Sequence, residues 1–316
     1  MSFNYPKMKN NFDIKVAILL TTFNGSPTVK QTIEKIEDSI LKYGKPVNVY
    51  IFDDCSSDNT VEVITQSWTL NRDNLIIVKN PYNLGLFQNK NKGLNYLRND
   101  YDWLLFMDQD DFPAENWISR LVEVITTNNT QNCLFIWSSY NNFRTDKLQL
   151  IIGDTKGNII THFPTKENLI FWIKKIYTPF CISGSAINTK LLNKTGLFNI
   201  KYNHFGDTDF LVRGMLMGFN HIYIASPLLV RSLNDLQASF RHLSTFRDFR
   251  EMPMYYNSFS KYLPIYDRFH FGITLLYTMF RRFCKAIIHL NFRNSLSIIR
   301  IFINLSFIIL KNLFKN

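Results

Sequence analysis

Short hydrophobic runs alternate with segments of helical spacing along the first half of the chain. The runs are too short for ordinary helices and predict buried strands at residues 15–20, 47–52, 75–78, 103–107 and 134–137. Between them, hydrophobic residues that recur every three or four positions predict helices at about residues 26–41, 61–68, 86–97 and 113–124. This order is typical of an α/β fold with right-handed crossovers and a mainly parallel sheet.

The segment from 141 to 165 is rich in Asn, Thr and Gly and predicts no clear element. Beyond it, the pattern predicts helices at 167–176, 191–195 and about 207–218, and a last strand at 221–225. Two helix starts carry local signals. Ser26 can cap the first helix with Pro27 at its first position, and Pro113 can open the fourth helix.

Polar residues follow four of the predicted strands, at the point where each strand ends. They read Thr-Thr-Phe-Asn at 21–24, Asp-Asp at 53–54, Lys-Asn at 79–80 and Asp-Gln-Asp-Asp at 108–111. The carboxyl ends of parallel strands lie along one edge of a sheet, and α/β sheets bind their ligands there. The sequence therefore predicts a binding site along this edge.

The acidic residues after the run at 103–107 give the strongest of these signals. In extended backbone Asp108 and Asp110 point the same way, whereas Asp111 points elsewhere. Three carboxylates at one strand end repel one another, and a divalent cation with oxygen ligands, shared with phosphate, relieves this repulsion. A solvated acidic turn is the other interpretation, since Asp is common in turns. Both interpretations stay open on this stretch alone.

The positive charge of the chain is concentrated in its C-terminal part. The 316 residues hold 36 Lys and Arg against 25 Asp and Glu, which gives a net charge of +11. Residues 236–316 contribute +9 of this charge, with 12 basic residues against 3 acidic ones. Asp267 is the last acidic residue of the sequence. The basic character is therefore a property of the C-terminal segment.

The cysteines and the N-terminus bear on the compartment. Four cysteines lie far apart without a CxxC motif, which suits a reducing compartment and argues against a disulfide framework or a zinc site. The first 12 residues contain no hydrophobic segment of a secretory signal. No unbroken hydrophobic run reaches the length of a membrane span. We therefore expect a cytoplasmic protein.

Six sequence blocks occur in order between residues 19 and 209. They are Leu19-Leu-Thr-Thr-Phe-Asn24, Ile51-Phe-Asp-Asp-Cys-Ser-Ser-Asp-Asn-Thr60, Asn83-Leu-Gly85 with Lys90-Asn-Lys-Gly93, Phe106-Met-Asp-Gln-Asp-Asp111, Ser183-Gly-Ser-Ala186 and Gly206-Asp-Thr-Asp209. Together they resemble the signature blocks of the family 2 glycosyltransferases, which have the GT-A fold. The chain is most similar to the rhamnosyltransferase-like branch, which builds bacterial surface polysaccharides.

The resemblance covers about residues 14–230 and implies an organisation of the chain in three parts. A tail at 1–13 precedes a GT-A domain at 14–235, and a basic helical segment follows at 236–316. The implied activity is an inverting transfer of a hexosyl or deoxyhexosyl group from a nucleotide diphosphate sugar. The acceptor would be a hydroxyl of a glycan or of a lipid-linked sugar.

The resemblance also implies residues that bind the UDP- or dTDP-linked donor. Thr21 and Phe23 would line the nucleotide base, and Asp54 would accept a hydrogen bond from the ring N–H of uracil or thymine. Lys90 stands where the family usually has Arg, and would contact the nucleotide as a point charge. The expected donor-binding set is Thr21, Phe23, Asn24, Asp54, Asn83, Gly85, Lys90 and Asp108.

The metal, the base and the acceptor side follow from the same blocks. Asp108 and Asp110 would hold Mg²⁺ or Mn²⁺ on the diphosphate. Asp207 matches the position of the general base, and Asp209 is the second choice, although either could simply cap a helix. On the acceptor side the similarity implies Gly184 and Ser185.

One part of the family pattern is missing from this sequence. Family members often carry a His shortly after the last strand, whereas the matching segment here, residues 231–235, has none. A contribution of His to the diphosphate or metal is therefore in doubt. Asn234 and His242 are the two candidates that could replace it.

The C-terminal segment allows two interpretations. Residues 268–316 mix Leu, Ile and Phe with Arg and Lys, which is typical of amphipathic helices that lie on a membrane. The other interpretation is a helical subdomain that packs on the core and exposes cationic faces. We favour contact with the inner leaflet, where lipid-linked acceptors are found, and expect a peripheral protein on the inner face of the cell membrane.

Two further functions compete with sugar transfer. A nucleotidyltransferase shares the parallel sheet and the metal carboxylates, but it would need a Gly-rich basic loop after the first strand, which residues 21–25 do not provide. A nucleic-acid-binding protein would fit the high pI and the aromatic content. The near-neutral charge of the first 235 residues argues against it, and we expect no nucleic acid partner.

Overall fold

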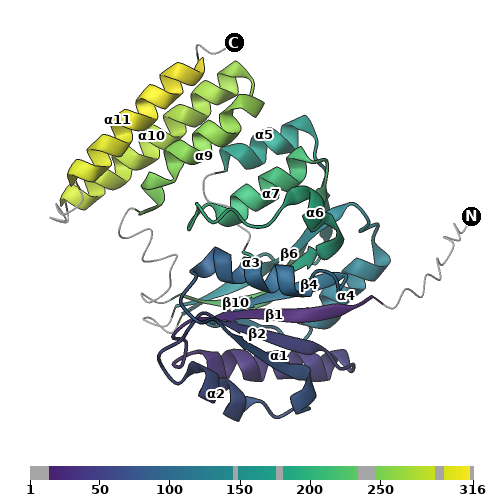
Figure 1. The fold of residues 1–316 in the computed structure, drawn as a ribbon. Helices are drawn as coiled ribbons and strands as arrows, with labels where there is room; N and C mark the ends of the chain where they lie inside the picture. The colour runs from purple at the N-terminus through teal and green to yellow at the C-terminus, as the bar shows by residue number, and fades with distance from the viewer. Residues whose placement is uncertain (1–13, 145–148, 176–180, 234–246, 289–294, 314–316) are drawn as a thin grey trace, which may run out of the picture.

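The computed structural model describes residues 14–144, 149–175, 181–233, 247–288 and 295–313. Its strands are β1 (Val16–Thr22), β2 (Asn48–Asp53), β3 (Leu75–Lys79), β4 (Trp103–Asp108), β5 (Asp111–Pro113), β6 (Cys133–Arg144), β7 (Gln149–Ile151), β8 (Ile159–His162), β9 (Ala186–Asn188) and β10 (Asn220–Leu233). They form one sheet in the order β3-β2-β1-β4-β9-β6-β10-β5, with β7 paired to β6 and β8 paired to β10. The sheet is curled and lies between two layers of helices (Figure 1).

The first four strands along the chain are parallel neighbours with hydrophobic residues on both faces. In β1, Ala17 and Leu19 belong to the core on one side of the sheet, whereas Ile18 and Leu20 belong to the core on the other. Successive side chains of a strand point to opposite faces, so a strand covered on both faces needs an unbroken hydrophobic run. The four predicted strands are confirmed here, although β3, at the edge of the sheet, is only half-buried.

The second half of the sheet is mixed. β9 is antiparallel to both β4 and β6, and β6 is parallel to β10. The strands predicted at 134–137 and 221–225 are the cores of these longer strands. β7 and β8 lie within the segment 141–165, for which the sequence predicted no element. The α/β class is thus confirmed, but the sheet is mainly parallel only in its first half.

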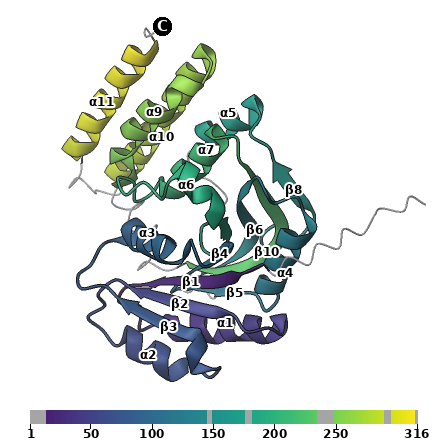
Figure 2. The same ribbon diagram turned by 45° about the vertical axis from the view of Figure 1, so that its right-hand side comes forward.

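Helices cover both faces of the sheet. They are α1 (Val29–Tyr43), α2 (Thr60–Ser67), α3 (Leu86–Leu97), α4 (Trp117–Thr127), α5 (Lys166–Lys174), α6 (Leu192–Thr195), α7 (Gly206–Leu216), α9 (Met252–Phe259), α10 (Ile265–Ile288) and α11 (Ser295–Leu313). α1, α2 and α4 pack against one face, and α3, α5, α6 and α7 pack against the other (Figure 2). Short 3-10 turns lie at Arg72–Asn74, Thr189–Leu191, Arg247–Arg250 and Ser260–Tyr262.

Two helix starts differ from the prediction. α1 begins at Val29 with Thr28 at the N-cap, and Ser26 instead donates its backbone N–H to Asp58 at 3.1 Å. Pro113 lies in β5, where it pairs with Leu229 of β10, and α4 begins only at Trp117. The local signals failed in both places because contacts with distant segments fix the backbone there.

The described part of the C-terminal segment is a layer of helices beside α5 and α7 (Figure 1). Phe271 and Leu275 of α10 and Leu305 of α11 are fully buried and belong to the same core as α7. An ion pair of 2.8 Å joins Lys174 of α5 to Asp267 of α10. Of the helices that the structure describes, none has the length and hydrophobicity to cross a membrane.

Candidate active site

Strand register brings the predicted strand-end residues to one edge of the sheet, which we call the carboxyl edge (residues 21–24, 53–54, 79–80 and 108–111). β1 lies between β2 and β4, with Thr21 paired to Phe52 on one side and to Asp108 on the other. Thr22 pairs with Asp53, whose buried carboxylate accepts hydrogen bonds from Thr22 and Ser56. Asp53 therefore has a structural role. Asp54 is also buried, whereas the side chain of Asp108 is partly exposed at this edge.

Lys90 of α3 reaches the carboxyl edge from the helical layer. Its ammonium group forms an ion pair with Oδ1 of Asp108 and lies 3.4 Å from Oγ1 of Thr21. Thr21 donates to the same Asp108 oxygen at 3.2 Å. The Lys90 side chain is only 2% exposed, and a charge buried to this degree needs a partner. Burial lowers the pKa of Lys90, but Asp108 raises it, and the net direction is upward.

Asp54 holds the loop that leads into α3. Its carboxylate accepts hydrogen bonds from the side chain of Asn80 and from the backbone N–H groups of Leu84 and Gly85, each at 2.8 Å. Gly85 has φ 87°, in the left-handed region that favours glycine. Asn83 is exposed and donates to the Asp54 carbonyl at 3.3 Å. These contacts gather the donor-binding candidates Asp54, Asn83 and Gly85, and their contact with a nucleotide stays a prediction.

Phe23 presents an exposed ring at the same edge, with 45% of the residue accessible. Its backbone N–H and C=O pair with the side-chain amide of Gln109 at 2.8 and 2.9 Å. A Cβ at position 25 would collide with that amide, so a larger residue there would displace the Gln109 side chain. Asn24 adopts φ 47° and accepts a hydrogen bond from the N–H of Ser57 at 2.9 Å. The loop thus holds Phe23 outward, free to stack on a planar ring.

Asp207 lies in the first turn of α7, close enough to Lys90 and Asp108 for their charges to act on it. Burial raises the pKa of the Asp207 carboxyl to about 6. Lys90 and a hydrogen bond from the backbone of Ile182 lower this pKa, whereas Asp108 raises it. A carboxyl group with a pKa near 6 is largely ionised at neutral pH and still basic enough to accept a proton in a reaction.

Asp209 does not share this environment. Its carboxylate forms an ion pair of 2.7 Å with Nε of Arg213, one helical turn further along α7. Arg213 also donates to the carbonyls of Thr195 and Leu197, so it joins α7 to the last residue of α6 and to the segment that follows. Burial raises the pKa of Asp209, and Arg213 opposes that rise. These are the contacts of a structural residue, and of the two base candidates only Asp207 faces the Lys90–Asp108 pair.

Sequence reasoning missed Arg231 and gave Asp111 no role. The two residues are paired across β5 and β10, and each has a buried side-chain atom without a hydrogen-bond partner, Oδ1 in Asp111 and Nε in Arg231. Burial raises the pKa of Asp111 to about 8, and the charge of Asp110 adds to this. The guanidinium of Arg231 lies over the ring of Tyr140 at 5.0 Å. The only signal in the sequence for Arg231 was its position as the first residue of segment 231–235, where family members often carry a His.

The residues expected on the acceptor side support β4. Gly184 has φ 80° and donates to the carbonyl of Phe106 at 2.8 Å, while its own carbonyl accepts from the indole of Trp117. Ser185 has no exposed surface, and its hydroxyl donates to the carbonyl of Ile182 at 2.5 Å. Gly184 and Ser185 thus pack against β4 at Phe106, two residues before Asp108. Contact of these two residues with an acceptor stays a prediction.

The donor set at the carboxyl edge fits a divalent cation. Asp108 and Asp110 are both partly exposed, and carboxylate oxygens are the ligands that Mg²⁺ and Mn²⁺ take. Repulsion from Asp110 and Asp108 adds to the raised pKa of Asp111, and repulsion from Asp108 adds to the raised pKa of Asp207. A bound cation would relieve this repulsion. Within the part of the chain that the structure describes, no three or more His, Cys, Asp or Glu residues form a metal-binding group. Such a cation would therefore need further ligands, which a diphosphate can supply.

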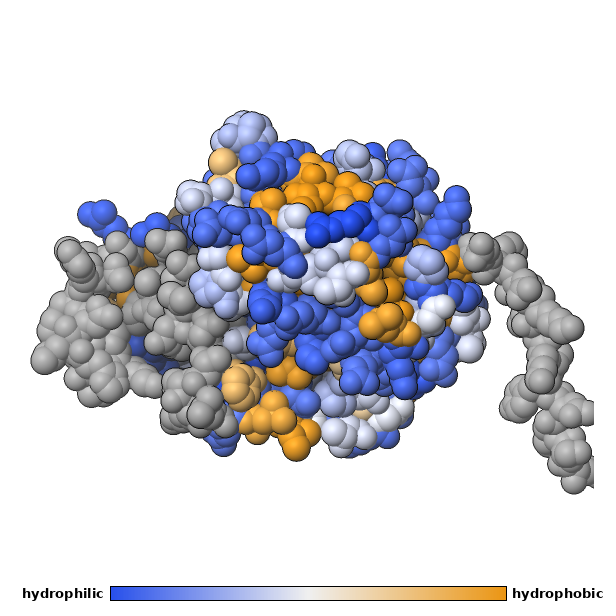
Figure 3. Space-filling model, turned by 90° about the horizontal axis from the view of Figure 1, so that it is seen from below, coloured by the Kyte–Doolittle hydropathy of each residue, from blue (hydrophilic) through white to orange (hydrophobic). Residues whose placement is uncertain are grey.

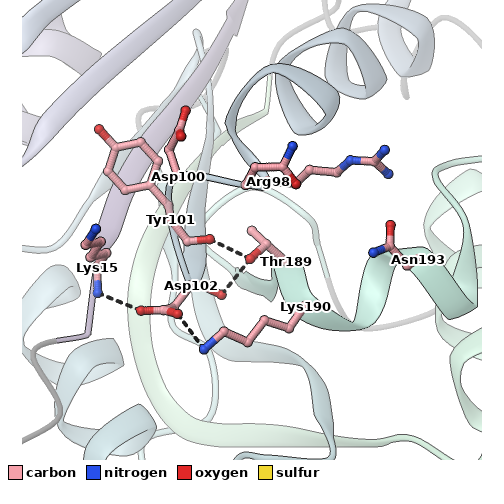
Figure 4. Close-up of a pocket in the computed structure, with 9 residues that line it drawn as sticks. Lys15, Arg98, Asp100, Tyr101, Asp102, Thr189, Lys190 and Asn193 are labelled. Carbon is pink, nitrogen blue, oxygen red and sulfur yellow. Dashed lines mark hydrogen bonds and ion pairs between the residues drawn. The ribbon is translucent and has the colours of Figure 1, made fainter.

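A separate cavity of about 430 Å³ opens at the opposite edge of the sheet. Its wall is formed where β1 and β4 begin and β9 ends, and Asp102 there accepts from the backbone of Lys15 and pairs with Lys190 at 2.6 Å (Figure 4). The residues that line it are Lys15, Arg98, Asn99, Asp100, Tyr101, Asp102, Thr189, Lys190 and Asn193. None of the predicted site residues belongs to this cavity.

The family model described as Glycosyl transferase family 2 matches residues 17–195, which is more than half of the chain. The chain belongs to this glycosyltransferase family. The matched range contains the whole carboxyl edge and Lys90, whereas Asp207 and the C-terminal segment lie beyond it. The family resemblance inferred from the six blocks is therefore confirmed, and the chain is an enzyme.

Two curated glycosyltransferases show the nature of this similarity. The chain is 24% identical over 195 residues to UDP-Glc:alpha-D-GlcNAc-diphosphoundecaprenol beta-1,3-glucosyltransferase WfaP of Escherichia coli, covering 62% of this chain and 67% of WfaP. It is 25% identical over 224 residues to chondroitin synthase of Pasteurella multocida (strain Pm70). That match covers 63% of this chain and 22% of the synthase. The chain thus spans only a small part of chondroitin synthase.

Solved structures show the same fold at low identity. Residues 1–349 of S. aureus TarS, in complex with UDP, superpose with a TM-score of 0.55 at 14% identity, covering 90% of each chain. The mannosyltransferase PcManGT from Pyrobaculum calidifontis, in complex with GDP-Man and Mn²⁺, gives 0.53 at 12% identity, covering 97% of this chain and 91% of PcManGT. The expected GT-A fold of this family member is therefore confirmed. The two residues considered in place of the missing His, Asn234 and His242, lie outside the described residues.

Proposed function

We propose that this chain catalyses an inverting, metal-dependent transfer of a hexosyl or deoxyhexosyl group from a nucleotide diphosphate sugar. The acceptor is a hydroxyl of a glycan or of a lipid-linked sugar in bacterial surface polysaccharide synthesis. One observation carries the proposal: the Asp207 carboxyl, with a pKa of about 6, lies close to the ion pair of buried Lys90 with partly exposed Asp108. A proton acceptor next to a site for phosphate and metal is what this reaction requires.

The donor binds along the carboxyl edge in this proposal. The exposed ring of Phe23 stacks on the base of UDP or dTDP. The Asp54 carboxylate has little exposed surface, and the one lone pair that remains on its Oδ2 accepts the ring N–H. Asn24, Asn83 and Gly85 shape the wall between these two contacts. The name of WfaP gives UDP-Glc as its donor, and TarS has been solved with UDP and with UDP-GlcNAc, which supports a uridine nucleotide.

Asp108 and Asp110 would hold the cation, as Mg²⁺ or Mn²⁺. When bound, such an ion supplies Lewis acidity that stabilises the negative charge of the leaving diphosphate. Lys90 contributes a fixed positive charge at the same place, because its ammonium group already lies against Asp108. PcManGT, which was solved with GDP-Man and Mn²⁺, supports a metal at this fold.

Asp207 acts as the general base. The acceptor hydroxyl forms a bond to the anomeric carbon while the bond from that carbon to the diphosphate oxygen breaks. The hydroxyl proton passes to the carboxylate of Asp207, and the electron pair leaves with the nucleotide diphosphate. A single displacement of this kind inverts the configuration of the anomeric carbon. The charge of Lys90 keeps Asp207 ionised enough to accept the proton at neutral pH.

The C-terminal helices would place the enzyme at the inner face of the cell membrane. α10 and α11 each carry a line of exposed hydrophobic side chains at helical spacing, which we call the outer stripes: Tyr266, Phe269, Ile273, Tyr277 and Phe280 on α10, and Ile299, Ile303, Phe307 and Leu310 on α11. Three exposed basic residues, Arg281, Arg300 and Lys311, each lie within one turn of a stripe, where they could contact anionic headgroups.

Two further observations support this location. The face seen from below, at the opposite end of the molecule from α10 and α11, is mostly hydrophilic with separate hydrophobic patches (Figure 3). The name of WfaP gives a diphosphoundecaprenol-linked acceptor, which is a lipid. An enzyme that uses such an acceptor gains from a surface that holds it at the bilayer.

A donor panel with two variants of α7 tests the reaction. Wild-type protein is incubated with UDP-, dTDP- and GDP-sugars and Mn²⁺, and slow donor hydrolysis and transfer to a lipid-linked sugar are measured. We expect Asp207→Asn to keep donor binding and lose turnover. Asp209→Asn should keep turnover and lose roughly 3 kcal/mol of stability, because it breaks the buried pair with Arg213. Full transfer by Asp207→Asn would show that Asp207 is not the base. If the wild-type protein turned over none of the donors, the proposed function would be wrong.

A further inference from the structure

A single carboxylate of the C-terminal segment holds the chain just before α7. Glu251, at the N-cap of α9, accepts three backbone N–H groups: that of Asn203 at 2.8 Å, that of His204 at 3.0 Å and that of Phe205 at 3.1 Å. Glu251 is only 6% exposed. Hydrogen bonds from N–H groups to a carboxylate are stronger than neutral ones, so these three bonds fix the backbone of this segment.

The segment that Glu251 holds sets the entry into α7. Phe205 is the N-cap residue of α7, and Asp207 follows within the first turn. Tyr255, one turn along α9, stacks on the ring of Phe205 at 5.1 Å. On the other side, a Cβ at Gly206 would collide with the ring of Phe87 of α3. The start of α7 is therefore clamped between α3 and α9, and its direction decides where the Asp207 carboxyl lies.

We propose that Glu251 is a positioning residue for Asp207, acting through the backbone of residues 203–205. The inference rests on the proposed role of Asp207 as the base. Displacement of a reacting group by about 1 Å can cost on the order of a hundredfold in rate. Loss of the Glu251 contacts therefore weakens the proton transfer without touching the donor. The C-terminal segment, which lies beyond the matched family range, is by this reasoning part of the scaffold of the active site.

The test compares Glu251→Gln with Glu37→Gln. Glu37 of α1 is the matched control because it is 5% exposed and also makes three such contacts, with the N–H of Thr69, the N–H of Leu70 and the hydroxyl of Thr69. It lies on the opposite face of the sheet from α7. In both variants an amide replaces a carboxylate oxygen that accepts N–H groups. The measurements are kcat, donor KM, melting temperature and amide hydrogen exchange in the full-length protein.

We expect Glu251→Gln to lower kcat by roughly ten- to a hundredfold. Donor KM should stay unchanged, and the amides of residues 203–207 should exchange faster. Glu37→Gln should speed up exchange at 69–70 and leave kcat unchanged. A Glu251→Gln protein with faster exchange and wild-type kcat would overturn the proposal, and so would an equal loss of kcat in both variants. Failure of the proposed function is seen separately, since wild type itself would then transfer no sugar.

Discussion

Lys90 and Asp108 form an ion pair in which the lysine side chain is 2% exposed and the aspartate side chain is 28% exposed. The pair joins α3 to the end of β4, and Thr21 of β1 donates to the same Asp108 oxygen. One end of this pair is therefore sealed in protein, while the other opens toward the site. Because the buried ammonium group of Lys90 already has a partner in the free enzyme, it is held in place before a diphosphate binds.

Removal of the Lys90 charge should change the pH profile. The charge of Lys90 lowers the pKa of Asp207, which burial raises to about 6. In Lys90→Met this lowering is lost, so the pKa of Asp207 rises and the proposed base is protonated at higher pH. We expect the acidic limb of the kcat/KM profile, near pH 6 in wild type, to move upward, and the donor KM to increase. Lys90→Arg keeps the charge and should keep the limb. If the acidic limb does not move in Lys90→Met, the charge of Lys90 does not act on the group that titrates there, and the prediction is wrong.

Metal dependence should reside in the strand-end carboxylates. Wild-type protein with UDP should be stabilised by Mn²⁺, by about 2.7 kcal/mol at a hundredfold excess over Kd, and EDTA should reverse this. Asp110→Asn should abolish the metal-dependent part of the shift in melting temperature. Asp100→Asn is the control, since Asp100 is an exposed carboxylate at the opposite edge of the sheet. Equal Mn²⁺ responses in Asp110→Asn and wild type would place the metal elsewhere.

The outer stripes should govern binding to anionic vesicles. Ile303 is 63% exposed, so Ile303→Glu should leave the fold intact and weaken binding by about tenfold or more, because it removes a hydrophobic side chain from the bilayer contact. Leu41→Glu is the control, with a leucine that is 65% exposed on α1. Flotation with vesicles that contain anionic lipid measures the effect. If Ile303→Glu instead dissociates an oligomer and binds vesicles like wild type, the stripe is a contact between protein chains.

Acid should destabilise the fold through a buried histidine. His221 of β10 is stacked on His162 of β8 at 4.6 Å, and neither ring nitrogen of His221 has a hydrogen-bond partner. Burial, aided by the charge of His162, lowers the pKa of His221 well below 6.5. Below pH 6.5, His221 therefore binds a proton in the unfolded chain but stays neutral in the folded chain. The free energy of unfolding falls as pH falls, by up to about 1.4 kcal/mol per pH unit.

Denaturant unfolding at pH 7.5 and pH 5.5 checks this expectation. The loss of unfolding free energy between the two values should be smaller in His221→Phe, which keeps an aromatic ring at the stack. Replacement of the exposed His270 by Gln should leave the loss as in wild type. An undiminished loss in His221→Phe would assign the acid sensitivity to other groups.

The first half of the fold could be predicted from the sequence because its signals are local. An unbroken hydrophobic run needs cover on both faces, and this alone predicted β1, β2 and β4. The helix predicted at 86–97 has the bounds of α3, because the hydrophobic spacing that predicts it lies within the helix itself. The strand ends of a parallel sheet share one edge, so the polar residues after these strands also predicted the carboxyl edge.

The sequence by itself determined the α/β class, the polar carboxyl edge and the set of carboxylates from which a metal site and a base could be drawn. Only the tertiary structure decided which carboxylates face one another. Asp207 and Asp209 are two positions apart in one helical turn, and the contact of Asp209 with Arg213 separates their environments. Residues as distant in sequence as Glu251 and Phe205 meet only after folding. Such pairings depend on how helices and strands pack, and the spacing of residues along the chain does not encode them directly.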